Sequence, residues 1–206
     1  NKNSGGNKAR EIRAAFDEKG IFVYQAFKPG LAEEALKKGS FGEEFKLSRM
    51  TWIKPSFGWM LHRSYYATKH DQERILKIKL KHEGFLAFLS KAIPAMFDPN
   101  LFKSTEEWRA ALRHSEVRYQ WDPDRDPRLR LLNHRALQIG IRGSMVREYI
   151  SNWIIKIEDA TELAHAIKAA VEQGIEKMPL IPEEYLYEVS REIQWKLGML
   201  KQPPGR

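Results

Sequence analysis

The feature that most constrains the fold of this chain is its alternation of short strand-like runs with short amphipathic segments. Residues 21–27 are β-branched and aromatic, which is typical of a buried strand. After Pro29 and Gly30, apolar residues recur with helical spacing until Gly39 ends the helix. Further strands are predicted at 49–54, 75–80, 116–121, 135–142 and 153–157, with helices at 83–92, 104–113, 144–151, 161–173 and 183–200. Without a repeat or a linker, this pattern predicts one α+β domain over residues 11–200.

Composition excludes several classes of protein. The chain has 206 residues, which suits one domain, and it has no cysteine. Disulfide scaffolds, thiolate metal sites and cysteine nucleophiles are therefore excluded. No apolar run approaches the ~20 residues that cross a bilayer, and residues 1–10 lack the apolar core of a secretory signal. We expect a cytoplasmic protein in which residues 1–10 are an unstructured or tag-derived tail and residues 201–206 are a frayed end.

Positive charge is concentrated in the middle of the chain. The net charge is +8, and residues 51–150 carry eighteen basic and eleven acidic side chains, whereas residues 151–206 carry seven and nine. A basic surface attracts phosphate groups on a nucleotide or a nucleic acid. The middle region therefore predicts binding of RNA or DNA, and the alternative is a basic protein without a polyanionic partner.

The common catalytic and phosphate-binding motifs are absent. The sequence contains no GxGxxG, GxxxxGK[ST], HExxH or GxSxG pattern, and its six histidines lack close ligand spacing. The two Asp-Pro steps in residues 121–130 predict a loop. Its alternating Asp122, Asp124 and Asp126 suit a hard metal ion, but pairing of these carboxylates with neighbouring arginines is favoured, so we predict no metal.

Two short segments carry unusual chemistry. Gln25 lies on a strand that should be buried, so its amide must be paired either within the core or with a ligand. The segment 49–59 combines two tryptophans, a phenylalanine, two cations and two hydroxyl side chains. Cations beside flat rings suit a nucleotide, because they match its phosphates and its base. The alternative is a tryptophan-rich core with cations that extend to the solvent.

Six segments resemble a known family. They are residues 12–17, 23–27, 49–64, 117–126, 135–143 and 153–161, and the most specific of them reads RMTWIKPSF. Together they resemble the bacterial and fungal family called domain of unknown function 4291. The resemblance spans nearly the whole chain and implies no activity.

Residues 22–41 have a second, more distant resemblance. This strand and helix closed by a glycine are similar to the opening block of ADP-ribosyltransferases and tRNA 2′-phosphotransferases. In that superfamily a histidine on the strand contacts a ribose of NAD, a later aromatic ring stacks on nicotinamide, and a late carboxylate orients the other ribose. Gln25 stands at the histidine position and Phe27 replaces a threonine. The resemblance implies a mixed or antiparallel split sheet with flanking helices, and NAD as the substrate.

This resemblance assigns roles to particular residues. Gln25 and Glu184 are the expected catalytic residues, although Glu184 also suits the first turn of an ordinary helix. The expected nucleotide-binding residues are Arg13, Tyr24, Arg49, Thr51, Trp52, Lys54, Ser56, Trp59 and Arg63. We expect Arg49, Thr51, Lys54 and Ser56 to line one pocket with Gln25, and Ser56 to cap the helix that follows Pro55.

Two other functions fit the same residues. A non-catalytic RNA- or DNA-binding domain would use the cations for the backbone and the tryptophans for base stacking. A nucleotidyltransferase or ligase would use Lys54 as its covalent nucleophile.

Overall fold

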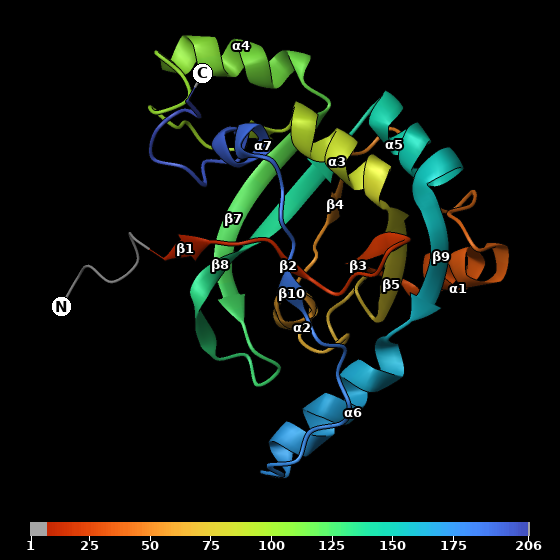
Figure 1. The fold of residues 1–206 in the computed structure, drawn as a ribbon. Coiled ribbons are helices and arrows are strands. Elements are labelled where there is room, and N and C mark those ends of the chain that lie inside the picture. Colours follow the sequence, from red (N-terminus) through yellow and green to blue (C-terminus); the bar gives the residue numbers. More distant parts are fainter. Residues whose placement is uncertain (1–7, 206) are drawn as a thin grey trace.

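The main sheet of the protein is mixed and five-stranded. The computed structural model describes residues 8–205. The strands are β1 (Ala9–Arg10), β8 (Leu131–Ile141), β7 (Val117–Arg125) and β6 (Ile93–Pro94) in that order, and β4 (Thr51–Ile53) also pairs with β8. The long β7–β8 hairpin is its centre (Figure 1).

A second, antiparallel sheet continues from the first. It consists of β3 (Gly20–Phe27), β5 (Arg74–Lys81) and β9 (Ile154–Asp159), with β5 in the middle. The two sheets meet where Tyr24 and Lys54 exchange backbone hydrogen bonds of 2.7 and 3.2 Å. The prediction of a single α+β domain is confirmed, and the sheet is curled around its core.

Seven α-helices flank the strands within residues 8–205. They are α1 (Pro29–Lys38), α2 (Phe57–Ser64), α3 (His82–Lys91), α4 (Thr105–His114), α5 (Ser144–Glu148), α6 (Thr161–Glu172) and α7 (Arg191–Lys196), and α5 continues into the π-helical turn η1 (Tyr149–Trp153). The side chain of Ser56 accepts the backbone N–H of Trp59, so its predicted role as the N-cap of α2 is confirmed.

The core divides into two clusters. The larger one lies on the face of the main sheet that carries Ile53, Tyr119 and Ile139. The smaller one packs Tyr24 of β3 against α2 and α6. Because strand side chains alternate, the residues next in sequence to Ile53, Tyr119 and Ile139 point to the opposite face of the main sheet, where α2 begins.

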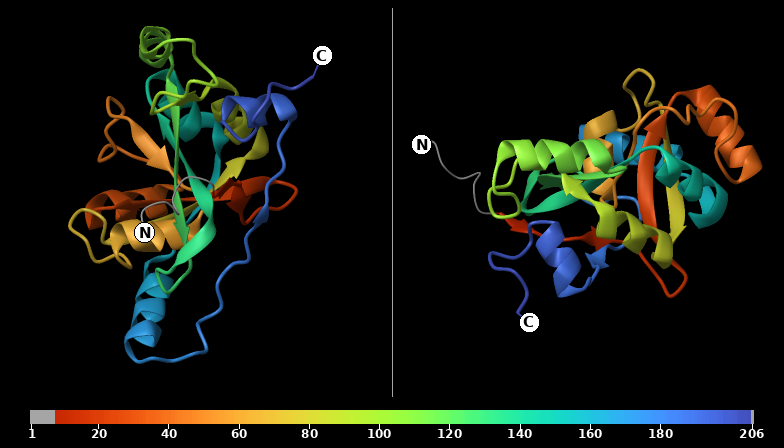
Figure 2. Two further views of the ribbon diagram at one scale, coloured as in Figure 1. Left: turned by 90° about the vertical axis from the view of Figure 1, so that its left-hand side faces the viewer. Right: turned by 90° about the horizontal axis from the view of Figure 1, so that it is seen from above.

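The C-terminal part crosses the molecule as an extended strap. After α6 the chain runs back along the outside, and β10 (Tyr185–Leu186) pairs antiparallel with β2 (Arg13–Ala14) (Figure 2, left). The helix predicted over residues 183–200 is therefore wrong outside Arg191–Lys196. The sequence carries helical residues here, but pairing with β2 holds residues 185–186 extended.

Other boundaries also differ from the predictions, among them the start of β8, which lies at Leu131 and not at residue 135. β7 runs to Arg125, so the loop predicted at 121–130 is wrong for its first half, and a shift in register follows Pro123. Proline lacks an N–H donor, and irregular pairing accommodates it. Ala9–Arg10 form β1 within the range predicted as a tail, whereas residues 1–7 and 206 lie outside the described residues.

Close packing at Gly58 fixes α2 against β7. A Cβ atom at this position would lie 1.8 Å from the carbonyl oxygen of Arg125. Gly58→Ala is expected to lower the free energy of unfolding by about 1–3 kcal/mol, because backbone overlap outweighs the gain of up to ~1 kcal/mol in helix propensity. Chemical denaturation measures the change.

Gly30→Ala is the matched control, because Gly30 holds the same second position of α1 and its Cβ would meet nothing within 4 Å. This variant should be stabilised by roughly 0.4–1 kcal/mol. Equal effects of the two substitutions would contradict the packing argument.

Candidate functional site

The second face of the main sheet is polar. Trp52 of β4 and Arg118 of β7 are both paired with Gly140 of β8, and Gln120 is paired with Gln138. The indole of Trp52 lies over Gly140, where a Cβ atom would come within 2.9 Å of its ring. We call this surface the polar sheet face and define it by Trp52, Lys54, Arg118, Gln120, Asp122 and Gln138.

Lys54 is the most perturbed cation of the polar sheet face. Burial lowers the pKa of its ammonium group to about 8, and the positive charge of Arg63 acts in the same direction. The carboxylate of Asp122 opposes this shift. The Lys54 ammonium donates a 3.3 Å hydrogen bond to the carbonyl of Trp52, and Asp122 accepts one from Gln138. A substantial neutral fraction of Lys54 is thus present near pH 8.

Helix α2 brings aromatic and cationic groups to the same region. Trp59 packs on His62 with ring centroids 5.0 Å apart and ring planes tilted by 32°, and burial together with the charge of Arg125 lowers the pKa of His62. Among the described residues, the indole N–H of Trp59 and the Nε–H groups of Arg118 and Arg125 are buried without a hydrogen-bond partner. Buried donors without partners are costly, and an oxygen-rich ligand would satisfy them.

A half-buried carboxyl group lies at the N-terminus of α2. The strap places Glu184 where its Oε2 accepts the backbone N–H of Phe57, the first helical residue, at 2.9 Å. Burial, and then the nearby Asp124, raise the pKa of Glu184 to about 8, although the Phe57 hydrogen bond opposes them. Perturbed carboxyl groups of this kind are common in active sites.

The Tyr24 hydroxyl group lies near the same N-terminus of α2. Tyr24 is 1% exposed, its ring packs on Phe57 with centroids 4.8 Å apart, and its oxygen has no partner among the described residues. Burial raises the pKa of this phenol, and the charge of Glu184 raises it further. A neutral hydroxyl donor and a titratable carboxyl group thus lie close together.

A hydrogen-bonded chain borders this pair. Ser56 donates from Oγ to Asp124 at 2.6 Å, and the other oxygen of Asp124 lies 2.8 Å from Nε2 of His134. The carboxylate stands between serine and histidine, so histidine cannot take the serine proton as it does in a hydrolase triad. We call Tyr24, Ser56, Asp124, His134 and Glu184 the acid–base cluster.

Gln25 occupies a different environment from the one expected for a ribose ligand. It is 2% exposed, and its amide nitrogen donates to Thr51 Oγ1 at 2.6 Å and to the Trp52 carbonyl at 3.0 Å. Its amide oxygen accepts the hydroxyl of Tyr149 at 2.7 Å. Both ends of the amide form hydrogen bonds within the chain, so we assign Gln25 to the buried core and not to a ligand site.

The structure does not bring the five residues of the expected pocket together. Arg49 and Thr51 line a recess of about 350 Å³ beside Phe27, away from the side chains of Lys54 and Ser56. Alternation along β4 explains this separation, because Thr51 and Lys54 point to opposite faces of the sheet. The expectation of one shared pocket is therefore wrong.

The remaining predicted residues lie around the acid–base cluster and the polar sheet face. Arg63 is exposed on α2, close enough to shift the pKa of Lys54. Arg13 forms an ion pair of 2.8 Å with Glu11, and its charge opposes the raised pKa of Glu184. Within residues 8–205, no group of three or more acidic or histidine side chains could hold a metal ion.

Several residues of the polar sheet face and of the acid–base cluster were not predicted from the sequence. Arg118 and Gln120 alternate with Val117 and Tyr119, and this spacing already indicated a polar strand face. Asp124 and His134 gave no such signal, because one lay in a predicted loop and the other before a predicted strand. Only the pairing of β7 with β8 brings them together.

The fold and these side chains define a mixed α+β protein with an acid–base cluster beside a polar sheet face. The chain belongs to the family described as domain of unknown function DUF4291, whose model matches residues 11–187. A search of curated proteins found no significant match. None of the helices in residues 8–205 is both long and apolar enough to span a membrane.

Proposed function

We propose that this protein is an ADP-ribosyltransferase-like enzyme that binds NAD and cleaves its nicotinamide–ribose bond. One observation carries the proposal: Glu184, a half-buried glutamate with a raised pKa, accepts the first N–H of α2 and acts electrostatically on the buried Tyr24 hydroxyl, which has no partner among the described residues. Catalytic carboxyl groups are tuned by burial and neighbouring charge in this way. The resemblance of residues 22–41 to that superfamily supports the same reaction class.

The polar sheet face supplies the groups that a dinucleotide requires. Lys54 and Arg118 would meet the pyrophosphate oxygens, and Arg63 would add positive charge at the edge. Trp52 and Trp59 offer ring surfaces for the base or the nicotinamide. Basic side chains of the middle region make a nucleic acid a suitable acceptor.

The reaction places positive charge on the ribose. The nicotinamide leaves with the electron pair of the C–N bond, and an oxocarbenium-like centre remains until an acceptor oxygen or nitrogen donates a pair and loses its proton. Glu184 as a carboxylate would accept a hydrogen bond from a ribose hydroxyl and stabilise that charge, while Tyr24 donates to a neighbouring oxygen. The cationic ring of NAD favours this ionised form of Glu184.

Lys54→Met provides the test of the binding site. The substitution keeps most of the side chain volume and removes the charge, so we expect NAD to bind at least about tenfold more weakly, because a charge-assisted contact is lost. Isothermal titration measures affinity, and chromatography measures nicotinamide release. Lys38→Met, at an exposed position at the end of α1, removes the same charge as a control. Equal NAD affinity in both variants would refute this site.

A second function is favoured by one observation, the lowered pKa of Lys54. A lysine with a pKa of about 8 is a better nucleophile than an ordinary lysine and could attack the α-phosphate of a nucleoside triphosphate, releasing pyrophosphate. Incubation with ATP and magnesium followed by intact-mass analysis would then show one added adenylate, absent in Lys54→Met. An unchanged mass together with nicotinamide release from NAD supports the first function.

A further inference from the structure

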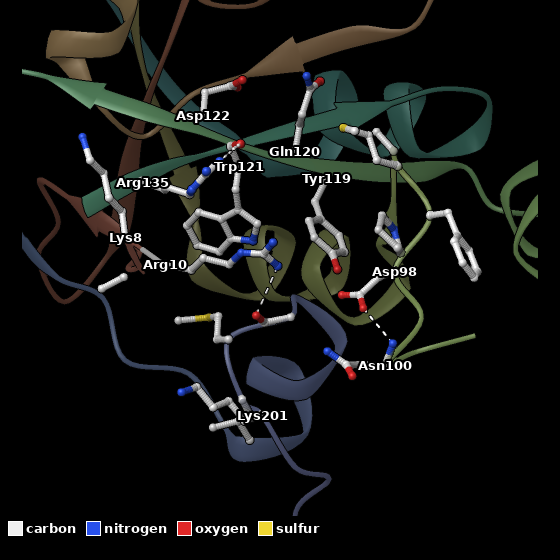
Figure 3. Close-up of a pocket in the computed structure, with 18 of the residues that line it drawn as sticks. Lys8, Arg10, Asp98, Asn100, Tyr119, Gln120, Trp121, Asp122, Arg135 and Lys201 are labelled. Carbon is white, nitrogen blue, oxygen red and sulfur yellow. Dashed lines mark hydrogen bonds between the residues drawn. The ribbon is translucent and has the colours of Figure 1, made fainter. Parts of the chain in front are cut away.

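A cavity lies on the opposite side of β7 from the polar sheet face. It has a volume of about 640 Å³ and is lined by three segments, residues 8–10, 94–100 and 198–201, over the strand residues 119–122. Figure 3 shows the side chains of Tyr119 and Trp121 on one side of the strand and those of Gln120 and Asp122 on the other. This cavity is therefore separate from the site described above.

Tyr119 places an unsatisfied hydroxyl group in this cavity. The residue is 3% exposed, and its oxygen has no hydrogen-bond partner among the described residues. Burial raises the pKa of the phenol, and the charge of Asp98 raises it further while Arg10 opposes the shift. The group is thus a neutral donor at neutral pH, in a place where a missing partner is costly.

The edge of β7 supplies a further donor, the backbone N–H of Trp121. The carbonyl of Tyr119 accepts the N–H of Ala95, so the backbone N–H and C=O of Tyr119 point away from β8. Because these groups alternate in direction along a strand, the N–H and C=O of Trp121 point to the same side as those of Tyr119. β6 pairs only with residues 118–119, so it does not cover Trp121. The Trp121 carbonyl accepts from Arg135 at 3.3 Å, whereas its indole N–H is already bound to Leu197, which leaves the ring as an apolar wall.

Cations outnumber anions around the cavity. Lys8, Arg10, Arg135 and Lys201 line it, and the carboxylate that faces them is Asp98, because Asp122 points to the other side of the sheet. Arg10 is held beside Tyr119 by a 3.2 Å hydrogen bond to the carbonyl of Gly198. At that glycine, a Cβ atom would lie 2.3 Å from the guanidinium, 3.4 Å from Oδ2 of Asp98 and 3.5 Å from the Tyr119 oxygen. The guanidinium, the carboxylate of Asp98 and the hydroxyl therefore converge on one point, and a bound phosphate would meet the two donors beside that carboxylate.

We propose that this cavity is a second ligand site, which takes a phosphorylated small molecule of nucleotide size. Its volume lies within the range of small-molecule sites, the phosphate would meet Arg10 and the Tyr119 hydroxyl, and a ring would lie against Trp121. Residues 8–10 and 198–201 lie outside the range that the family model matches. The inference concerns a separate site and holds whether or not NAD is cleaved at the polar sheet face.

Titration with AMP tests the proposal, with adenosine and inorganic phosphate as partial ligands. Tyr119→Phe should bind AMP about two- to tenfold more weakly through the loss of one hydrogen bond. Its unfolding temperature should be unchanged or higher, because the removed hydroxyl has no partner in the free protein. Arg10→Ala should weaken AMP at least about tenfold. Arg147→Ala, which removes an exposed cation of α5, should bind AMP as the wild type does.

Three results would overturn the inference. The first is the absence of AMP binding, and the second is unchanged affinity in both Tyr119→Phe and Arg10→Ala. The third is loss of AMP binding in Lys54→Met with full retention in Arg10→Ala, which would place AMP on the polar sheet face. Adenosine and phosphate that each bind more weakly than AMP would support a site for both parts of the ligand.

Discussion

Glu184→Gln should reduce the rate of NAD cleavage by about 100-fold or more, because the amide cannot supply the negative charge that stabilises a cationic transition state. The substitution keeps the shape of the side chain and an oxygen that can accept the N–H of Phe57. NAD affinity should change less than the turnover number. Measuring both constants separates loss of chemistry from loss of binding.

The pH dependence of the rate follows from the same group. Since the pKa values of Glu184 and Lys54 are both about 8, the value of kcat/KM for the wild type should rise toward pH 8 as Glu184 ionises and fall above it as Lys54 loses the charge that binds the pyrophosphate. Glu184→Gln should lack this rise. A wild-type rate that shows no rise below pH 8 would contradict a role for Glu184 as a carboxylate. A variant with full activity would remove Glu184 from the mechanism.

The stability of the protein should respond to pH in the opposite sense. The pKa of Glu184 is raised from 4.5 to about 8, so between these values the unfolded chain releases a proton that the folded protein retains. The free energy of unfolding therefore falls as pH rises through this window, by up to about 5 kcal/mol from this group. Glu184→Gln should lack that component, and the difference between the two denaturation series isolates it from histidine titration.

Gln25→Ala should lower the free energy of unfolding by about 3–5 kcal/mol. The substitution opens a cavity and leaves the hydroxyl groups of Thr51 and Tyr149 without their partner. NAD affinity per folded molecule should stay the same, because both ends of the amide are used inside the core. Chemical denaturation and titration of the folded fraction measure the two effects.

Tyr149→Phe is the control for this network. It removes one hydroxyl and leaves the oxygen of Gln25 unpaired, so we expect a smaller loss of about 1–3 kcal/mol. The double variant should cost less than the sum of the two, since both remove the same hydrogen bond. A Gln25→Ala protein of normal stability that fails to bind NAD would return Gln25 to the ligand site.

Local patterns were sufficient to predict much of this fold. The strand at 21–27, the glycine that ends α1 and the Ser56 cap depend on neighbouring residues, and each is present in the structure. The strap was not predictable in this way. Residues 185–186 are extended because they pair with residues 13–14, and nothing near them in the sequence indicates that partner.

The candidate site shows the same limit. Trp52, Lys54 and Trp59 lie close together in the sequence, so their proximity in the structure was expected from their positions alone. Which side each occupies depends on the register of β4 against β8, and that register separates Thr51 from Lys54. The amide oxygen of Gln25 pairs with Tyr149 and the carboxylate of Glu184 pairs with Phe57, and each partner lies more than a hundred residues away in the sequence.

The pairing of β10 with β2 has a consequence for synthesis of the protein on the ribosome. α2 and the first strands emerge about 120 residues before Glu184 does. The N-terminus of α2 can therefore form early, but Phe57 has no carboxyl partner until the strap crosses it. If Glu184 carries the chemistry, the nascent protein remains inactive until its C-terminal part has been synthesised and has paired with β2.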